Sequence, residues 1–209
     1  LGDVYKRQHV YSKLAYDPAT DFVPVSPLVI ATCALAVSSA VPASVKTLQD
    51  YVAWVRATPT GASYASPAAG SVAHFLGWQL SEAGGLKLQH VGYRGSAPAM
   101  QDLLGGQIPA YLGFVADFLP YLQSGKLRIL AVSGEQRSRF MPAVPTFAEQ
   151  DFAQIRGAEN YGVFAPPGTP EAGVRALHEA MVVASKDPGL RAAFDQVGLE
   201  VHTQAPDDY

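Results

Sequence analysis

The sequence predicts an α/β fold built on a largely parallel sheet, and three observations support this prediction. Segments that read as strands alternate with segments that read as helices along the chain, which is the pattern of successive βαβ units. Loops rich in glycine and serine follow two of the strands and lead directly into helices. Hydrophobic residues make up 48% of the 209 residues and charged residues only 16%, which indicates a packed globular core.

The composition also argues against several classes of protein. The formal net charge is −3 and the basic residues are scattered, which argues against a nucleic-acid-binding surface. Cys33 is the only cysteine, so no disulfide can form within the chain, and its apolar neighbours predict a buried side chain. The most apolar run, Val25 to Val37, is too short and too interrupted to span a bilayer. The first residues lack the apolar region of a signal peptide.

The expected elements follow one another in chain order. Strands are expected at Leu28–Ser38, Ala62–Ala65, Leu86–Val91, Ile108–Phe114, Leu127–Val132, Tyr161–Phe164 and Leu199–His202. Helices are expected after the capping box Thr47-Leu-Gln-Asp50, over Ser71–Ala83, after Ser96, over Asp117–Gln123, after Thr169-Pro170 and after Asp187-Pro188. Thr146-Phe-Ala-Glu149 forms a second capping box, and Ser71, Ser96 and Thr169 are the expected N-caps.

The stretch from Tyr64 to His74 contains the first glycine loop and is the leading candidate for a binding site. A strand leads into Ser66, small residues follow as far as Gly70, and Ser71 caps the next helix. Backbone N–H groups and the positive end of the helix dipole favour a bound anion there. Neither Lys nor Arg lies in the loop, so the expected ligand is a small carboxylate held by neutral donors. The alternative is a tight turn with no ligand.

A second loop of the same design runs from Tyr93 to Ala97 and also opens a helix. In an open α/β sheet such loops gather at the carboxyl ends of the strands, so both loops are expected to face one crevice. Tyr93 would add a hydroxyl and an aromatic wall, whereas Arg94 is more simply explained as a solvated loop residue.

The remaining polar residues give weaker signals. His74 follows Ser71 by three residues and so lies on the same side of the helix start, where it could face a ligand or bind a neighbouring carbonyl. Asp117 could line the crevice but is expected to cap the short helix. No spacing of His, Asp or Glu predicts a metal site, and no nucleotide-binding motif predicts a cofactor. The surroundings of Ser66 and Ser71 do not match a nucleophile elbow, so no catalytic residue is predicted.

An ordered set of short segments resembles one family. The segments are Tyr16-Asp-Pro with Asp21-Phe-Val-Pro-Val25, Ser66–His74, Tyr93–Ala99, Asp102–Gly106, Ser124–Ala131, Pro142–Thr146 with Glu149, and Ala165–Pro170. In this order they resemble the Bug family, the periplasmic receptors of tripartite tricarboxylate transporters. The resemblance runs from about His9 to the C-terminus, and the ordered set is far more specific than any one segment.

The resemblance implies a two-lobed, periplasmic-binding-protein-like fold of type II. Residues 1–42 and 132–209 would belong to the first lobe, and residues 43–131 would form a contiguous second lobe. Family members begin with a strand, a glycine-rich loop and a helix that have no counterpart here. The first lobe is therefore expected to be incomplete and the chain to be a fragment. Residues 1–8 match nothing in the family and are expected to be spurious.

The resemblance also implies a function. The protein would be a periplasmic receptor that captures a small carboxylate between its lobes for the membrane components of a tripartite transporter. It would be a monomer when full length, would not span the membrane and would bind no nucleic acid, metal or cofactor. The implied ligand-binding residues are Ser66, Ala69, Gly70, Ser71, His74, Tyr93, Gly95, Ser96 and Ala97.

Two other functions are weighed against the receptor. One is the ligand-sensing domain of a transcriptional regulator, because such domains share the two-lobed fold. An enzyme is a more distant alternative. The upstream reading frame distinguishes the receptor from the regulator, since a receptor requires a signal peptide and a regulator requires a basic helix-turn-helix.

Overall fold

The computed structural model describes residues 15–17, 20–58 and 62–208, so the prediction about residues 1–8 lies outside the described residues. The chain divides into two compact units. Unit 1 takes in the described parts of Leu1–Ala31 and Glu159–Tyr209, and unit 2 is Thr32–Ala158. Unit 2 is longer at both ends than the predicted second lobe, because the second half of the long strand β1 (Val23–Ser38) pairs inside it.

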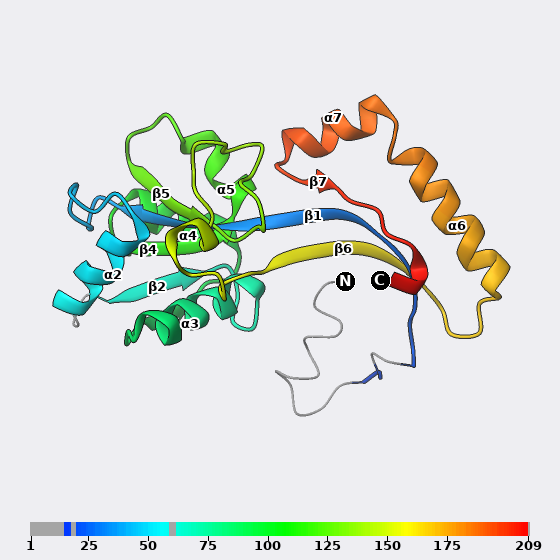
Figure 1. The fold of residues 1–209 in the computed structure, drawn as a ribbon, viewed down its shortest axis with the longest axis horizontal. Helices are drawn as coiled ribbons and strands as arrows, with labels where there is room; N and C mark the ends of the chain where they lie inside the picture. The colour runs from blue at the N-terminus through cyan, green and yellow to red at the C-terminus, as the bar shows by residue number, and fades with distance from the viewer. Residues whose placement is uncertain (1–14, 18–19, 59–61, 209) are drawn as a thin grey trace. The chain divides into compact units, whose positions relative to one another are not determined.

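The strands of unit 2 lie in the order β3-β2-β4-β1-β5 (Figure 1). Their bounds, besides those of β1, are β2 (Ser63–Ser66), β3 (Gln89–Gly92), β4 (Ala110–Phe114) and β5 (Leu127–Val132). β2 is parallel to β3 and to β4, whereas β1 is antiparallel to β4 and to β5. The prediction of a largely parallel sheet is therefore wrong for this half of the sheet. β1 does not enter unit 2 through a βαβ crossover, so nothing imposes a parallel direction on it.

Two helical segments begin with a capping box, as predicted. In α2 (Leu48–Ala57), the Thr47 hydroxyl accepts from the Asp50 N–H at 3.1 Å, and the Asp50 carboxylate accepts from the Thr47 N–H at 3.0 Å. The same two bonds join Thr146 and Glu149 at the start of η3 (Ala148–Gln150), which is a single 3₁₀ turn. The other helical segments of unit 2 are α3 (Val72–Gly84), α4 (Ser96–Leu104), α5 (Val115–Phe118) and η2 (Leu119–Tyr121).

Ser71 is the N-cap of α3, as predicted, but two other predicted N-caps are wrong. The N-cap of α4 is Gly95, whose φ of 106° suits glycine and strains a residue with a side chain, and Ser96 is the first helical residue. The N-cap of α6 (Glu171–Ala184) is Pro170. Thr169 instead donates its hydroxyl hydrogen to the Pro166 carbonyl at 2.7 Å.

Helices cover both faces of the sheet in unit 2, because successive strand residues point to opposite faces. On β2, Tyr64 joins a core formed with α2 and α3, and Ala65 joins a second core formed with α4 and α5. Leu76 and Leu80 of α3 lie in the first core, whereas Leu103 of α4 lies in the second. α3 and α4 therefore lie on opposite faces of the sheet.

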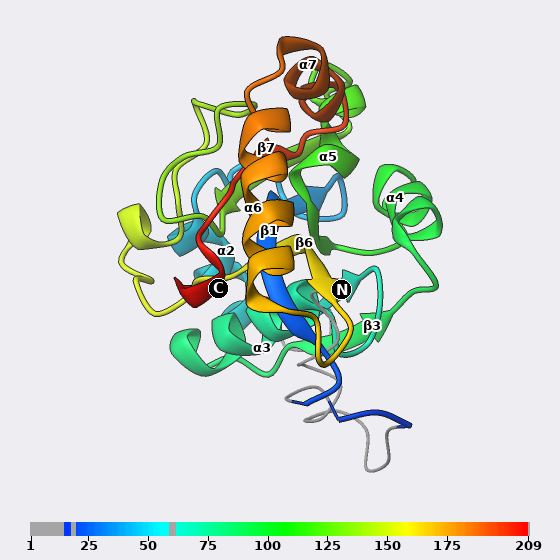
Figure 2. The ribbon, with the colours of Figure 1, turned by 90° about the vertical axis from the view of Figure 1, so that its right-hand side faces the viewer.

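Unit 1 is built on the first half of β1, which pairs with β6 (Ala158–Ala165) and β7 (Glu200–Val201). The pairing with β7 is antiparallel and sets Val29 opposite Val201. Helix α6 packs on β1 and β6 through Val174, which contacts a small core with Val25 and Ala165 (Figure 2). The other elements are α7 (Pro188–Gln196), which begins after the predicted Asp187, and η4 (Pro206–Asp208). β1 begins at Val23 rather than at the predicted Leu28.

Candidate ligand-binding site

Two glycine loops of unit 2 meet at one edge of the sheet. Because β2 and β3 are parallel neighbours, the loops that follow them leave from the same edge. The Tyr93 N–H donates to the Ser66 carbonyl at 3.0 Å, and the Gly95 N–H donates to the Pro67 carbonyl at 2.8 Å. These backbone hydrogen bonds join the two loops, so the starts of α3 and α4 lie beside each other even though the helices cover opposite faces.

The serines of the first loop stabilise the loop itself. Ser66 is fully buried, and its hydroxyl lies 3.0 Å from the Ala68 carbonyl and 2.8 Å from Nε2 of His90. Ser71 accepts from the His74 N–H at 3.2 Å and donates to the Ala68 carbonyl at 2.7 Å. The part of this loop that is open to a ligand is the backbone around Ala69, which is exposed.

His74 and His90 form a stacked pair beside the first loop, with ring centroids 3.8 Å apart and an interplanar angle of 21°. The Gly70 N–H donates to Nδ1 of His74 at 3.0 Å, so His74 is neutral and carries its proton on Nε2. The Tyr64 hydroxyl donates to the His74 carbonyl at 2.9 Å, and the Tyr64 ring lies 5.1 Å from the His90 ring. His74 therefore fixes the loop that was predicted to bind ligand. Its partner His90 gave no local signal in the sequence.

Both histidine rings are held neutral. Burial and the neighbouring His74 lower the pKa of His90 from 6.5 to about 4, and burial lowers the pKa of His74. The unfolded chain has the ordinary pKa, so it binds more protons than the folded chain at pH values between these two limits. The stability that the neutral rings contribute is complete above about pH 6.5 and is lost as the pH falls towards about 4.

We expect the free energy of unfolding to decrease as the pH is lowered from about 7 to about 5, and we expect His90→Gln to flatten this decrease. Glutamine can still donate to the Ser66 hydroxyl but does not titrate. Urea unfolding at the two pH values measures the effect, with Gln89→Ala at the exposed neighbouring residue as the control. An unchanged pH dependence in His90→Gln would contradict this role for the pair.

The second loop offers a ligand the backbone N–H groups at the start of α4 and few free side-chain groups. The Tyr93 hydroxyl donates to Oδ2 of Asp102 at 2.6 Å, and burial together with this bond raises the pKa of Tyr93 to about 12. Gly95 and Ala97 are exposed, and Ser96 is half-buried. The N–H groups of Ser96 and Ala97 lie in the first turn of α4, where they have no acceptor within the helix. The positive end of the helix dipole adds to their attraction for an anion.

The carboxyl end of β4 lies at the same edge, because β4 is also parallel to β2. β4 leads directly into α5, which begins at Val115. Phe114 is the N-cap residue, and Asp117, in the first turn, caps the helix start with its side chain as predicted. Oδ2 of Asp117 accepts from the Phe114 N–H and from the Tyr111 hydroxyl, each at 3.0 Å. Burial raises the pKa of Asp117, and hydrogen bonds from Ser96, Tyr111 and Phe114 partly offset this rise.

A hollow of about 370 Å³ lies between the start of α4 and α5, and Asp117 lines it. The other lining residues are Ser96, Ala97, Met100, Gln101, Ala116, Pro120 and Tyr121. Two of the predicted ligand-binding residues, Ser96 and Ala97, therefore share a hollow with a carboxylate. The sequence raised Asp117 as a residue that could line the crevice, but it gave no sign that Ser96 would lie beside it.

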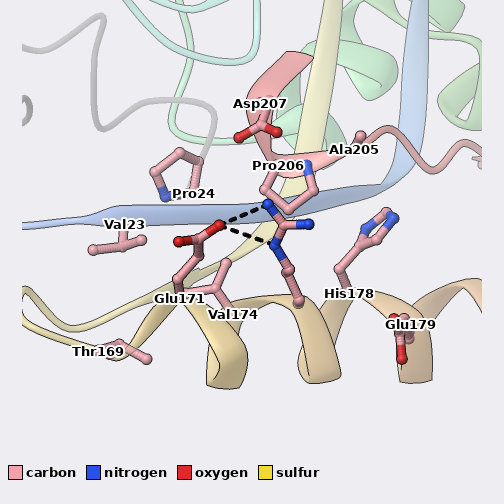
Figure 3. Close-up of a pocket in the computed structure, with 11 residues that line it drawn as sticks. Val23, Pro24, Thr169, Glu171, Val174, His178, Glu179, Ala205, Pro206 and Asp207 are labelled. Atoms are coloured by element: carbon pink, nitrogen blue, oxygen red, sulfur yellow. Dashed lines mark hydrogen bonds and ion pairs between the residues drawn. The ribbon is translucent and has the colours of Figure 1, made fainter.

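Unit 1 has a larger hollow, of about 450 Å³, between α6 and the segment near Pro206 (Figure 3). Glu171 and Arg175 pair across one turn of α6 at 2.6 Å, so the guanidinium charge is already matched. Glu179 and Asp207 add two more carboxylates. Nδ1 of His178 is buried and has no hydrogen-bond partner among the described residues. Such an acidic hollow disfavours a carboxylate, so the anion site is better placed in unit 2.

Within the part of the chain that the structure describes, no cluster of three or more His, Cys, Asp or Glu residues could hold a metal ion. Over the same residues, no helix combines the length and the hydrophobicity that a membrane crossing requires. What the edge of unit 2 offers is a set of neutral backbone donors from two helix starts, together with one half-buried carboxylate.

The chain belongs to the tripartite tricarboxylate transporter family of receptors, whose family model matches residues 2–209. The match therefore begins before His9 and includes residues 2–8, for which no counterpart in the family was expected. It is 31% identical over 198 residues to a protein of Cupriavidus necator, the UPF0065 protein in the gbd 5′ region. That match covers 95% of this chain and 59% of the relative, so the chain spans a little over half of the relative's length.

Solved structures show the same fold. The chain is similar to a structure described as a periplasmic transporter, with 33% sequence identity and a TM-score of 0.82 over 99% of this chain and 67% of that one. It is also similar to Rpa4515 of R. palustris with adipate, with 29% identity and a TM-score of 0.82 over 95% of this chain and 66% of that one. The periplasmic-binding-protein-like α/β fold that the sequence predicted is therefore confirmed.

Proposed function

We propose that this chain is part of a periplasmic receptor that captures a small carboxylate for the membrane components of a tripartite transporter. The observation that supports the proposal most strongly is the meeting of two helix starts at one edge of unit 2. The first-turn N–H groups of α4, including that of Ala97, would bind the carboxylate oxygens. The neighbouring structure with adipate supports a carboxylate as the ligand.

The predicted site residues have different roles in this proposal. The backbone at Ala69, Gly70, Gly95, Ser96 and Ala97 would face the ligand, and Tyr93 would form a wall. Ser66, Ser71 and His74 would act indirectly, because their polar atoms bond within the first loop. Binding would need no chemistry, so the protein would act as a receptor and not as an enzyme. A monomeric state and a cognate transporter belong to the same proposal, and the family description supports the transporter.

The proposal is tested by Ala97→Glu in the receptor made from its complete open reading frame. An acidic side chain in the first turn favours the helix but repels a carboxylate bound there, at a cost of about 1–4 kcal/mol for charges about 4 Å apart. We therefore expect affinity for the best carboxylate to fall at least about fivefold while the melting temperature stays the same or rises. A thermal-shift screen of mono-, di- and tricarboxylates selects the probe, and titration calorimetry measures its affinity.

The matched control is Ala172→Glu, because Ala172 is the exposed second residue of α6 just as Ala97 is the exposed second residue of α4. This control should leave carboxylate affinity unchanged. If no carboxylate raises the melting temperature of the unmodified receptor, the proposed function is wrong. Equal weakening of binding by both substitutions would instead show that the α4 start is not the site.

A further inference from the structure

We propose that Asp117 makes the hollow beside α4 selective for the ammonium group of an amino acid, so that the ligand is an acid with an amine and not a plain dicarboxylate. This inference rests on the proposed carboxylate site at the start of α4 and deepens it. It begins from a mismatch: the hollow that Ser96 and Ala97 line for an anion is also lined by a carboxylate.

The charges around the hollow indicate which ligand group would pair with Asp117. Asp117 is the only charged side chain among the residues that line it, and the others are neutral. Asp117 accepts hydrogen bonds from Tyr111 and from the Phe114 N–H, both on Oδ2, and a further hydrogen bond from the Ser96 side chain. An ionised carboxylate has about four acceptor positions, so acceptor capacity remains for a ligand. Asp117 is half-buried, and partial burial of a carboxylate without a cation costs free energy that a ligand ammonium would offset.

The two ends of the hollow differ in sign. The start of α4 offers N–H groups and the positive end of a helix dipole, whereas Asp117 of α5 offers a negative charge beside it. A zwitterion can place its carboxylate at the first and its ammonium at the second. A dicarboxylate whose second acid group reached Asp117 would bring like charges together. Burial already raises the pKa of Asp117, which is the direction expected for a carboxyl group that lacks a cation.

The fold supports this place for a ligand. β2 and β4 are parallel neighbours at Ala65 and Tyr111, yet α3 follows β2 on one face of the sheet and α5 follows β4 on the other. The chain thus leaves two adjacent strands towards opposite faces, which is the arrangement of a topological switch point. Ligands of open α/β sheets bind in the crevice at the carboxyl ends of such strands. The start of α5, with Asp117, forms one side of this crevice.

The test uses three probes of one carbon skeleton: glutarate, 2-hydroxyglutarate and glutamate. Titration calorimetry on the receptor made from its complete open reading frame should show glutamate bound at least about tenfold more tightly than glutarate. Asp117→Asn keeps a side-chain oxygen for the Phe114 N–H, so the helix start is preserved. We expect this variant to bind glutamate at least about tenfold more weakly and glutarate no more weakly than the parent.

A second variant keeps the proposal testable if Asp117→Asn does not fold. Gln101→Glu places another carboxylate at an exposed position of the same hollow, without touching the α5 start, and should increase the preference for glutamate over glutarate. Two results would each overturn the role of Asp117: glutarate or 2-hydroxyglutarate bound by the parent as tightly as glutamate, or a preference for glutamate that neither variant changes. Failure of all three probes and of the wider carboxylate screen would instead overturn the proposed function itself.

Discussion

Replacing Gln150 with leucine is expected to lower the free energy of unfolding by about 2–6 kcal/mol, since each buried polar group left without a partner costs about 1–3 kcal/mol. The Gln150 amide is 8% exposed and joins two elements of unit 2. Its Oε1 accepts from the Leu48 N–H at the start of α2, and its Nε2 donates to the Leu130 carbonyl in β5, each at 2.9 Å. Leucine has a similar size but can satisfy neither group.

Urea unfolding of the chain measures this effect, and Gln107→Leu provides the control. Gln107 is exposed, and its amide makes only a long contact of 3.4 Å with the Gly105 carbonyl. The same change of side chain at this position should alter stability by less than about 0.5 kcal/mol. A Gln150→Leu variant as stable as the Gln107→Leu control would show that water or a neighbouring group replaces the amide.

Gly77→Ala is the second substitution with a large expected effect. Overpacking is expected to lower the free energy of unfolding by about 1–3 kcal/mol. A Cβ atom on Gly77 would lie 2.0 Å from Cε2 of the Tyr64 ring, far inside van der Waals contact. Tyr64 is 3% exposed, and its hydroxyl holds the His74 carbonyl, so the ring cannot move without disturbing the histidine pair. We therefore expect weaker carboxylate binding as well as a lower melting temperature, although alanine favours the helix by about 1 kcal/mol.

Gly173→Ala is the matched control, because it makes the same change in helix α6 with ordinary space around it. The nearest atom to its added Cβ is a methyl carbon of Thr169 at 3.6 Å. This variant should be as stable as the parent or more stable by up to about 1 kcal/mol. Thermal unfolding and calorimetric titration of both variants give the comparison. If Gly77→Ala has the same melting temperature and carboxylate affinity as Gly173→Ala, the close packing of α3 on Tyr64 is important for neither stability nor binding.

Helix caps whose partners lie a few positions apart could be predicted from the sequence, and the structure confirms them. The Thr47–Asp50 box and the Ser71 cap depend on residues three positions apart, which a sequence shows directly. Ser96 was wrongly predicted as the N-cap of α4, because backbone conformation decides this position. The loop after β3 needs a positive φ, and the glycine before Ser96 provides it.

The pairing of distant residues could not be predicted in the same way. His90 meets Ser66 across two parallel strands, and nothing in the 24 positions between them indicates the contact. The antiparallel direction of β1 was missed because a buried strand has the same apolar pattern in either direction. Asp117 was predicted as a cap on local grounds, whereas its place beside Ser96 depends on the register of β2 and β4.

The position of β1 has a consequence for how the chain folds. Val37 pairs with Ala110 on one side and with Arg128 on the other, so β1 acquires both of these neighbours only after most of unit 2 has been made. Contacts between residues so distant in the chain slow folding, because the intervening loop must be closed before they form. Until then, a strand that the native fold buries on both faces is open to association. The yield of folded protein is therefore set by how long the ribosome and chaperones keep this segment from meeting another copy.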